Sequence, residues 1–174
     1  MQLPPRTMTQ LPPSALTAAD RAILRAQLGR EPRAAVEVAV RCVCGNPVVV
    51  RTAPRLPDGT PFPTTYYLTH PRLASAIGTL EATGLMAEMT ARLGEDEELA
   101  AVYQAAHRHY LEKRGELGEV PEIEGISAGG MPTRVKCLHA LVAHALAAGP
   151  GVNPLGDEAL ACLESVWRAD RCSC

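Results

Sequence analysis

Residues 34–41, AAVEVAVR, set valine at every second position, and this alternation decides the fold class. Val36, Val38 and Val40 have the period of a β-strand with one buried face. Two more strands are predicted at residues 48–50 (VVV) and 64–69 (TTYYLT), with a loop rich in proline at 54–63 between them. Three short strands joined by short connections favour an antiparallel sheet.

The remaining patterns are helical. Thr17 and Asp20 have the spacing of a capping box in front of an apolar face, and Pro71 suits a first helical turn. Further helices are predicted at about 86–93, 96–115 and 133–148, with a last one reaching Trp167. Aromatic residues make up only 3% of the chain, so Ala, Leu and Val supply most of the apolar share, which favours packed helices. We predict an α+β fold: a small antiparallel sheet of about three strands covered by about five helices.

Composition limits the classes of function. Residues 1–16 are predicted to form a proline-rich flexible tail and residues 17–170 a single α+β domain. No run of 18 apolar residues and no signal-peptide core are found, so we expect a cytoplasmic protein without membrane association. The net charge of −2 shows no basic excess, so no nucleic-acid partner is expected, although Arg41, Arg51 and Arg55 lie close together in the sequence.

Six cysteines in a reducing compartment are either buried apolar side chains or metal ligands. Cys42 and Cys44 flank a turn at Gly45, but their one-residue gap is shorter than that of most zinc knuckles. If the strand continues through them, their side chains point to opposite faces. The terminal Cys172-Ser-Cys174 is interpreted as incidental.

Histidines and a third cysteine are the other candidate ligands. Cys137 and His144 are seven residues apart on a predicted helix and share a face, whereas His139 points elsewhere on a regular helix. His70 lies where a strand ends and the Pro71 helix begins. For each of these residues simple packing is the alternative role. His107 and His109 are expected on a solvated helix face.

A glycine-rich segment suggests an anion site. Gly129 and Gly130 precede the helix predicted from residue 133, and Lys136 falls near its first turn. Backbone N–H groups at a helix start bind anions, so a phosphorylated or anionic small molecule is a candidate ligand. A purely structural turn is the alternative.

Several blocks together resemble one family. The blocks are Arg41-Cys42-Val-Cys44-Gly45-Asn-Pro47, Phe62-Pro63-Thr64, Tyr67-Leu68-Thr69-His70-Pro71, Gly129-Gly130, Lys136-Cys137-Leu138-His139 and Asn153-Pro154-Leu155-Gly156. In this order, over about residues 20 to 165, they resemble the bacterial domain of unknown function 501. The resemblance implies a matched ligand set of Cys42, His70 and Cys137, completed by His139 or His144. Relatives often carry cysteine at the His70 position, and zinc tolerates that exchange better than an iron–sulfur cluster does.

The leading hypothesis is therefore a cytoplasmic protein of structural or regulatory role that binds zinc or an iron–sulfur cluster through a single convergent site. One alternative is an enzyme acting on an anionic small molecule, with Cys137 or His139 in proton transfer or attack. The other is a metal-free interaction module that docks a protein partner.

Overall fold

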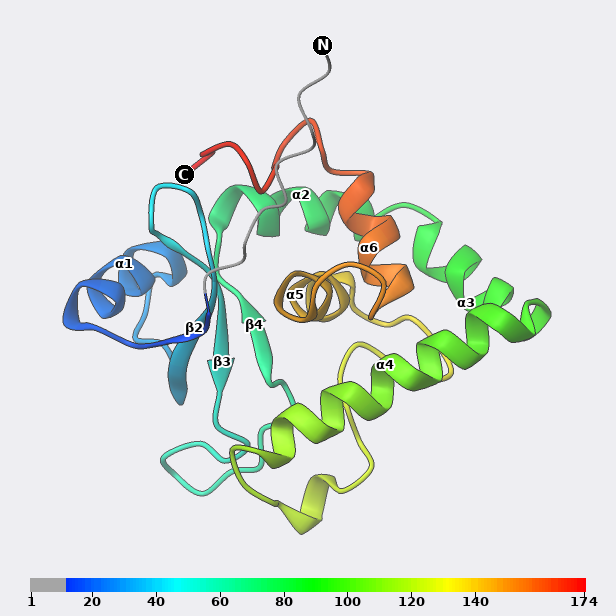
Figure 1. Cartoon of the computed structure of the whole chain (residues 1–174), viewed down its shortest axis with the longest axis horizontal. Coiled ribbons are helices and arrows are strands. Elements are labelled where there is room, and N and C mark those ends of the chain that lie inside the picture. Colours follow the sequence, from blue (N-terminus) through cyan, green and yellow to red (C-terminus); the bar gives the residue numbers. More distant parts are fainter. Residues whose placement is uncertain (1–11) are drawn as a thin grey trace.

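The computed structural model describes residues 12–174 (Figure 1). Its strands are β1 (Ser14–Ala15), β2 (Ala35–Arg41), β3 (Pro47–Thr52) and β4 (Tyr66–Leu68). Its helices are α1 (Ala18–Leu28), α2 (Pro71–Glu81), α3 (Leu85–Glu95), α4 (Glu97–Gly115), α5 (Leu138–Ala148) and α6 (Pro154–Ala161), with a short 3₁₀ turn, η1 (Pro121–Ile123). A small antiparallel sheet and six helices over these residues confirm the predicted α+β class.

The strands form one sheet in the order β1-β2-β3-β4. In the antiparallel register Val38 faces Val50, and Val49 faces Leu68. The strands β2, β3 and β4 occupy the stretches predicted from the sequence. The additional strand β1 pairs with β2 inside the segment interpreted as a tail. The rest of the tail prediction, residues 1–11, lies outside the described residues, and the single domain over 17–170 remains a prediction.

Helices cover both faces of the sheet (Figure 1). On one face α1 packs through Leu24 against Val50, while the neighbouring Val49 faces the main core, because successive strand residues point to opposite sides. On the other face α5 lies against β4 and is in turn covered by α6. Every α5 residue from Ala140 to Leu146 is buried, so this helix is the centre of the molecule.

The predicted helix starts rest on side-chain caps. Thr17 Oγ1 accepts from the Asp20 backbone N–H at 3.0 Å, and the Asp20 carboxylate accepts from the Thr17 N–H at 3.0 Å, which completes the capping box. Pro71 occupies the first turn of α2, where its missing N–H costs nothing.

Two predicted helix bounds are wrong. The helix predicted from residue 133 begins at Leu138, because the preceding segment folds back on itself: the Lys136 N–H donates to the Gly129 carbonyl at 2.7 Å. The last helix ends at Ala161 rather than at Trp167. Trp167 follows a series of turns, and its N–H donates to the Leu163 carbonyl.

Helices α5 and α6 approach each other closely at Gly156. Its N–H donates to Asn153 Oδ1 at 2.9 Å, so it belongs to the capped first turn of α6. A Cβ at this position would overlap the Leu141 carbonyl oxygen and lie 2.8 Å from the Ala145 Cβ. Only a residue without a side chain allows this spacing between the two helices.

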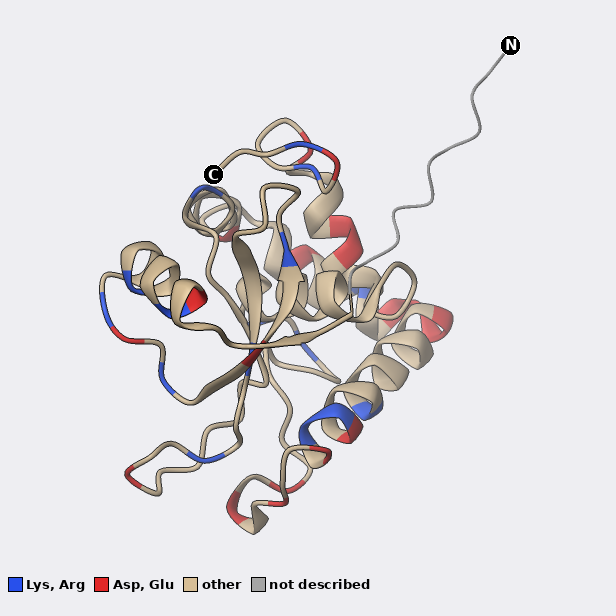
Figure 2. Cartoon of the chain, turned by 60° about the vertical axis from the view of Figure 1, so that its left-hand side comes forward, with Lys and Arg blue, Asp and Glu red and all other residues tan. Residues whose placement is uncertain are grey.

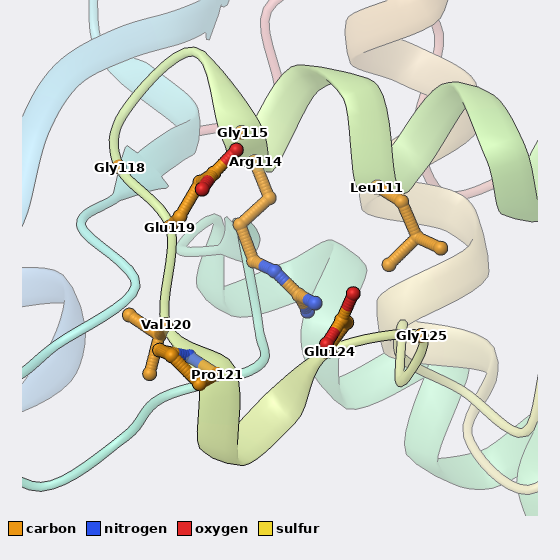
Figure 3. A pocket seen from close by; sticks show the side chains of 9 residues that line it. All are labelled: Leu111, Arg114, Gly115, Gly118, Glu119, Val120, Pro121, Glu124 and Gly125. Carbon is orange, nitrogen blue, oxygen red and sulfur yellow. The ribbon is translucent and has the colours of Figure 1, made fainter.

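Arg114, at the end of α4, ties down the loop that follows. Its buried guanidinium donates to the carbonyl oxygens of Pro63 at 3.2 Å, Ile123 at 2.8 Å and Ile126. Figure 3 shows the side chain beside a hollow of about 320 Å³ that Glu124 also lines. Three carbonyls from two separate loops therefore converge on one cation.

Replacing Arg114 with lysine is expected to lower the free energy of unfolding by about 2 kcal/mol, since a single ammonium cannot reproduce the planar fork that reaches three carbonyls. Urea denaturation measures the change. Arg108→Lys, at an exposed position of the same helix, is the control and should stay within about 0.5 kcal/mol of the parent protein. Equal losses in both variants would contradict the special role of Arg114.

Candidate metal centre

The first two cysteines lie in the turn between β2 and β3. The Gly45 N–H donates to the Cys42 carbonyl at 2.8 Å, and the Cys42 N–H donates to the Asn46 carbonyl at 2.8 Å. Gly45 has φ +93°, a conformation that favours glycine. The strand therefore stops before Cys42, and the turn brings the Cys42 and Cys44 thiols close together instead of placing them on opposite faces.

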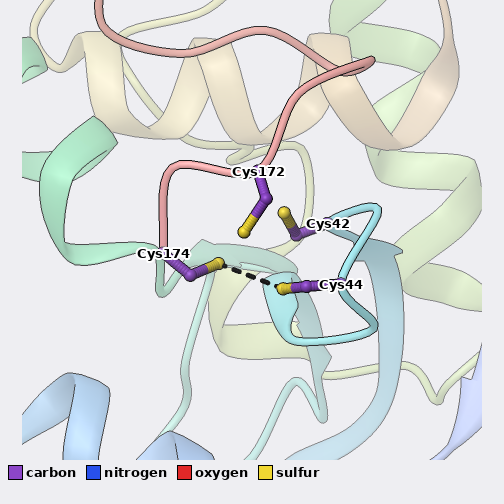
Figure 4. Close-up of side chains that lie close together, drawn as sticks. All are labelled: Cys42, Cys44, Cys172 and Cys174. Atoms are coloured by element: carbon purple, nitrogen blue, oxygen red, sulfur yellow. Dashed lines mark hydrogen bonds between the residues drawn. The ribbon is translucent and has the colours of Figure 1, made fainter.

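Cys172 and Cys174, at the other end of the chain, complete a group of four thiols. All four Sγ atoms lie within 4.8 Å of one another, and those of Cys44 and Cys174 are 3.5 Å apart (Figure 4). Cys42 is buried, whereas the other three are exposed. We call these four residues the four-cysteine cluster; they are the ligand type that both zinc and iron accept.

The turn also favours the ionised form of one thiol. The hydrogen bond from the Asn46 backbone N–H, helped by the neighbouring thiols of the cluster, lowers the pKa of Cys44 to about 7. The thiolate is the form that ligates metal ions, so one member of the cluster reaches that form near neutral pH.

A second group of ligand-type side chains consists of Glu81, Cys137 and His139, whose ligand atoms also lie within 4.8 Å of one another. His139 Nδ1 is 3.1 Å from Glu81 Oε1, and its Nε2 is 3.0 Å from the Ala74 carbonyl oxygen. The neighbouring Cys137 thiol and then the Glu81 carboxylate raise the pKa of His139 to about 9. Glu81 comes from the end of α2 and the other two from the start of α5.

The two remaining predicted ligands belong to neither group. His70 is fully buried and caps α2, where its Nδ1 accepts from the Leu73 N–H at 3.2 Å. That bond uses the lone pair of Nδ1 and leaves the ring proton on Nε2. His144 is also fully buried, with its Nε2 2.9 Å from His109 Nδ1. The structure thus places Cys42 in the four-cysteine cluster, Cys137 and His139 in the second group, and the two buried histidines in neither.

Other expectations about single residues also change. His107 is buried and lies 2.8 Å from Ser127 Oγ, so it does not lie on a solvated face as expected. His109 is half-buried and stacks on His144. Arg41, Arg51 and Arg55 each pair with a carboxylate, at 2.7, 2.9 and 2.9 Å. Basic and acidic residues are both scattered over the fold (Figure 2). Among residues 12–174 no helix has the length and apolarity needed to span a bilayer.

The predicted anion-binding residues line a common hollow of about 450 Å³. Gly129, Gly130 and Lys136 contribute to its wall together with Arg134 and Cys137. Both glycines have positive φ, and a Cβ added at either one would lie within 3 Å of a neighbouring atom. The turn itself therefore requires glycine at both positions. The first N–H of α5 is already bonded to Glu81 Oε1 at 2.6 Å, so this N–H is not available to an anion.

Sequence reasoning missed three of the grouped residues. The spacing Cys-x-Cys occurs twice, at 42–44 and at 172–174, and this repetition was the available signal for the second pair. Glu81 gives no such signal, because a glutamate at a helix end is usually solvated.

One of three comparisons with known proteins found a match. Residues 38–161 match the family described as protein of unknown function (DUF501). Searches of curated proteins and of solved structures found no match. The matched segment contains Cys42, Cys44, Glu81, Cys137 and His139 and ends before Cys172 and Cys174. Since the match covers most of the chain, this protein belongs to the DUF501 family of proteins of unknown function.

Proposed function

We propose that this protein binds one zinc ion through the four-cysteine cluster, and that the ion has a structural role. The single observation that carries the proposal is the convergence of four thiols, from two distant parts of the chain, within 4.8 Å. The ion would hold the C-terminal segment against the turn between β2 and β3.

The sulfur spacing favours a single ion over a cluster of irons. Zinc–sulfur bonds of about 2.3 Å in a tetrahedron place the sulfur atoms about 3.8 Å apart. The Cys44–Cys174 separation of 3.5 Å is close to that value, and no pair of sulfur atoms in the group is more than 4.8 Å apart. An iron–sulfur cluster inserts several irons and sulfides between its thiolates and so requires a wider arrangement.

Four protein ligands leave no open coordination position, which is typical of structural zinc rather than catalytic zinc. The four-cysteine cluster therefore suggests no reaction. Because three of the four thiols are exposed, the share of chains that carry zinc can follow the supply of the metal. In that case the ion would have a regulatory role as well as a structural one.

Metal analysis of protein purified under reducing conditions tests the proposal. The double variant Cys44→Ser/Cys174→Ser is expected to contain one equivalent of zinc per chain less than the parent protein, because two thiolates are too few for a closed zinc site. Cys162→Ser is the matched control, since Cys162 is exposed and lies outside both ligand groups. Circular dichroism verifies that each variant is folded.

The opposite result is equally informative. If the double variant and the control contain the same amount of metal as the parent, the cysteines of the cluster are not ligands. If that common amount is zero, the protein is better described as a metal-free interaction module that docks a protein partner through its helices.

An enzyme acting on an anionic small molecule is the second candidate. The observation that favours it is the hollow of about 450 Å³ in which Arg134 and Lys136 lie near Cys137. Two cations beside a thiol can hold a phosphate or carboxylate group close to a reactive side chain.

A further inference from the structure

Outside the four-cysteine cluster, Glu81, Cys137 and His139 offer three different ligand atoms at one point. Zinc sites with three protein ligands from nitrogen, oxygen and sulfur donors keep a fourth position for water or substrate. The chemistry of this group therefore differs from that of the four thiols, and it does not depend on them.

The orientation of His139 suits a ligand. A histidine that binds a metal donates its other ring N–H to a carbonyl or carboxylate, which fixes the ring. Here Nε2 lies 3.0 Å from the Ala74 carbonyl oxygen and can only donate to it. Nδ1 is the nitrogen that remains; it faces Glu81 and Cys137 and donates to Glu81 Oε1, so an ion bound between them would take the place of this proton.

Glu81 is held in place in the same way. Its Oε1 accepts from the Leu138 N–H at 2.6 Å, so the start of α5 positions the carboxylate. The distance from His139 Nδ1 to Glu81 Oε1 is 3.1 Å. Nitrogen and oxygen ligands on one tetrahedral zinc, with bonds of about 2.0 to 2.1 Å, lie about 3.3 Å apart. The two atoms are thus already near the separation that a shared ion requires.

Two hollows meet at this group. Cys137 and His139 both line one of about 450 Å³ that β4, the start of α2 and the end of α1 also border. In its wall Gln27 Oε1 is a buried acceptor without a partner among the described residues. Cys137 also lines the hollow that contains Arg134 and Lys136. A fourth ligand could therefore enter from solvent, and an anionic one would meet two cations.

We propose that Glu81, Cys137 and His139 form a second, open zinc site whose fourth position takes an oxygen of a small anionic ligand, with Lys136 beside it. The site supplies what the four-cysteine cluster lacks, namely a coordination position that a substrate can reach.

Cobalt titration of the Cys44→Ser/Cys174→Ser protein tests this site separately from the first. Cobalt(II) is added alone at pH 8, and each ion that binds must displace the proton on His139 Nδ1. We expect one equivalent to bind, with visible bands and one near-ultraviolet band from a single thiolate. Adding Cys137→Ser should abolish the near-ultraviolet band, and adding His139→Asn should weaken binding at least tenfold. Adding Cys162→Ser should leave the titration unchanged.

The variant Glu81→Gln separates a loss of metal binding from a loss of folding. Glutamine keeps an oxygen that can cap α5, while the charge of the ligand is removed. It should weaken cobalt binding at least tenfold in a protein whose thermal unfolding is unchanged. Cobalt binding that is equally strong in all these variants would overturn the site, whatever the zinc content of the four-cysteine cluster.

Inorganic phosphate is the probe for the fourth position. It should shift the visible cobalt bands of the Cys44→Ser/Cys174→Ser protein, and Lys136→Gln should weaken this phosphate effect about tenfold without changing cobalt affinity. A cobalt spectrum that phosphate does not alter would overturn the proposed anionic ligand.

Discussion

Gly156→Ala is expected to lower the free energy of unfolding by about 3 kcal/mol or more, because the added methyl group overlaps backbone and must push α6 away from α5. The obstacle is the Leu141 carbonyl, which belongs to a helix buried on all sides and cannot move alone. Relief therefore requires shifting an entire helix, which also disturbs the cap at Asn153. Urea denaturation of the variant and the parent measures the loss.

Gly78→Ala is the matched control for this substitution. Gly78 is an exposed residue inside α2, and a Cβ built there meets no atom within 4 Å. Alanine at such a position should stabilise the protein by about 0.5 to 1 kcal/mol through its better helix propensity. If both variants change the free energy of unfolding in the same direction by similar amounts, the close packing of α5 on α6 does not depend on glycine at position 156.

His144 is expected to make the protein markedly less stable in mild acid. The Gly156 N–H donates to Asn153 Oδ1, which fixes the orientation of the Asn153 amide. Asn153 Nδ2 therefore faces His144 and donates to its Nδ1 at 3.2 Å. The His144 proton is therefore on Nε2, directed at His109. Burial, together with repulsion from His109, lowers the pKa of His144 from 6.5 to about 3.

The direction of the effect follows from proton binding. Below about pH 6.5 the unfolded chain binds a proton at His144 that the folded chain excludes, so stability falls as the pH falls toward 3. Between pH 6.5 and 4.5 the loss from this residue alone is about 2 kcal/mol. Urea denaturation at several pH values, with EDTA present to remove metal effects, gives the profile for the parent and for His144→Gln. Parallel profiles would show that His144 does not titrate in this way.

The sheet was predictable because its signal is local. The valine alternation at 36–40 and the aromatic and β-branched run at 64–69 each lie within a few residues, and β2 and β4 form there. The start of α5 was not predictable, because residues 133–137 have no residue that breaks a helix pattern after Pro132. What delays the helix is a set of backbone bonds, such as Lys136 to Gly129, that depend on the folded loop.

The candidate ligands were predictable by type but not by grouping. Spacing along a chain says which side chains share a helix face, but it does not say which distant segments meet. Cys42 was expected near Cys137 and instead lies with Cys172 and Cys174, because the chain after α6 returns to the β2–β3 turn. Glu81 meets His139 only because α2 and α5 pack together.

The meeting of Cys44 with Cys174 also has a consequence for the denatured chain. The two residues are 130 positions apart, so a covalent bridge between them, which persists in the unfolded chain, would close a loop that contains most of the protein. Closing so large a loop removes conformational entropy on the order of 5 kcal/mol from the unfolded ensemble. A bond at the rim of the molecule would thus contribute as much to folding as a well-packed interior side chain, and it would do so by restricting the disordered state rather than by adding contacts to the ordered one.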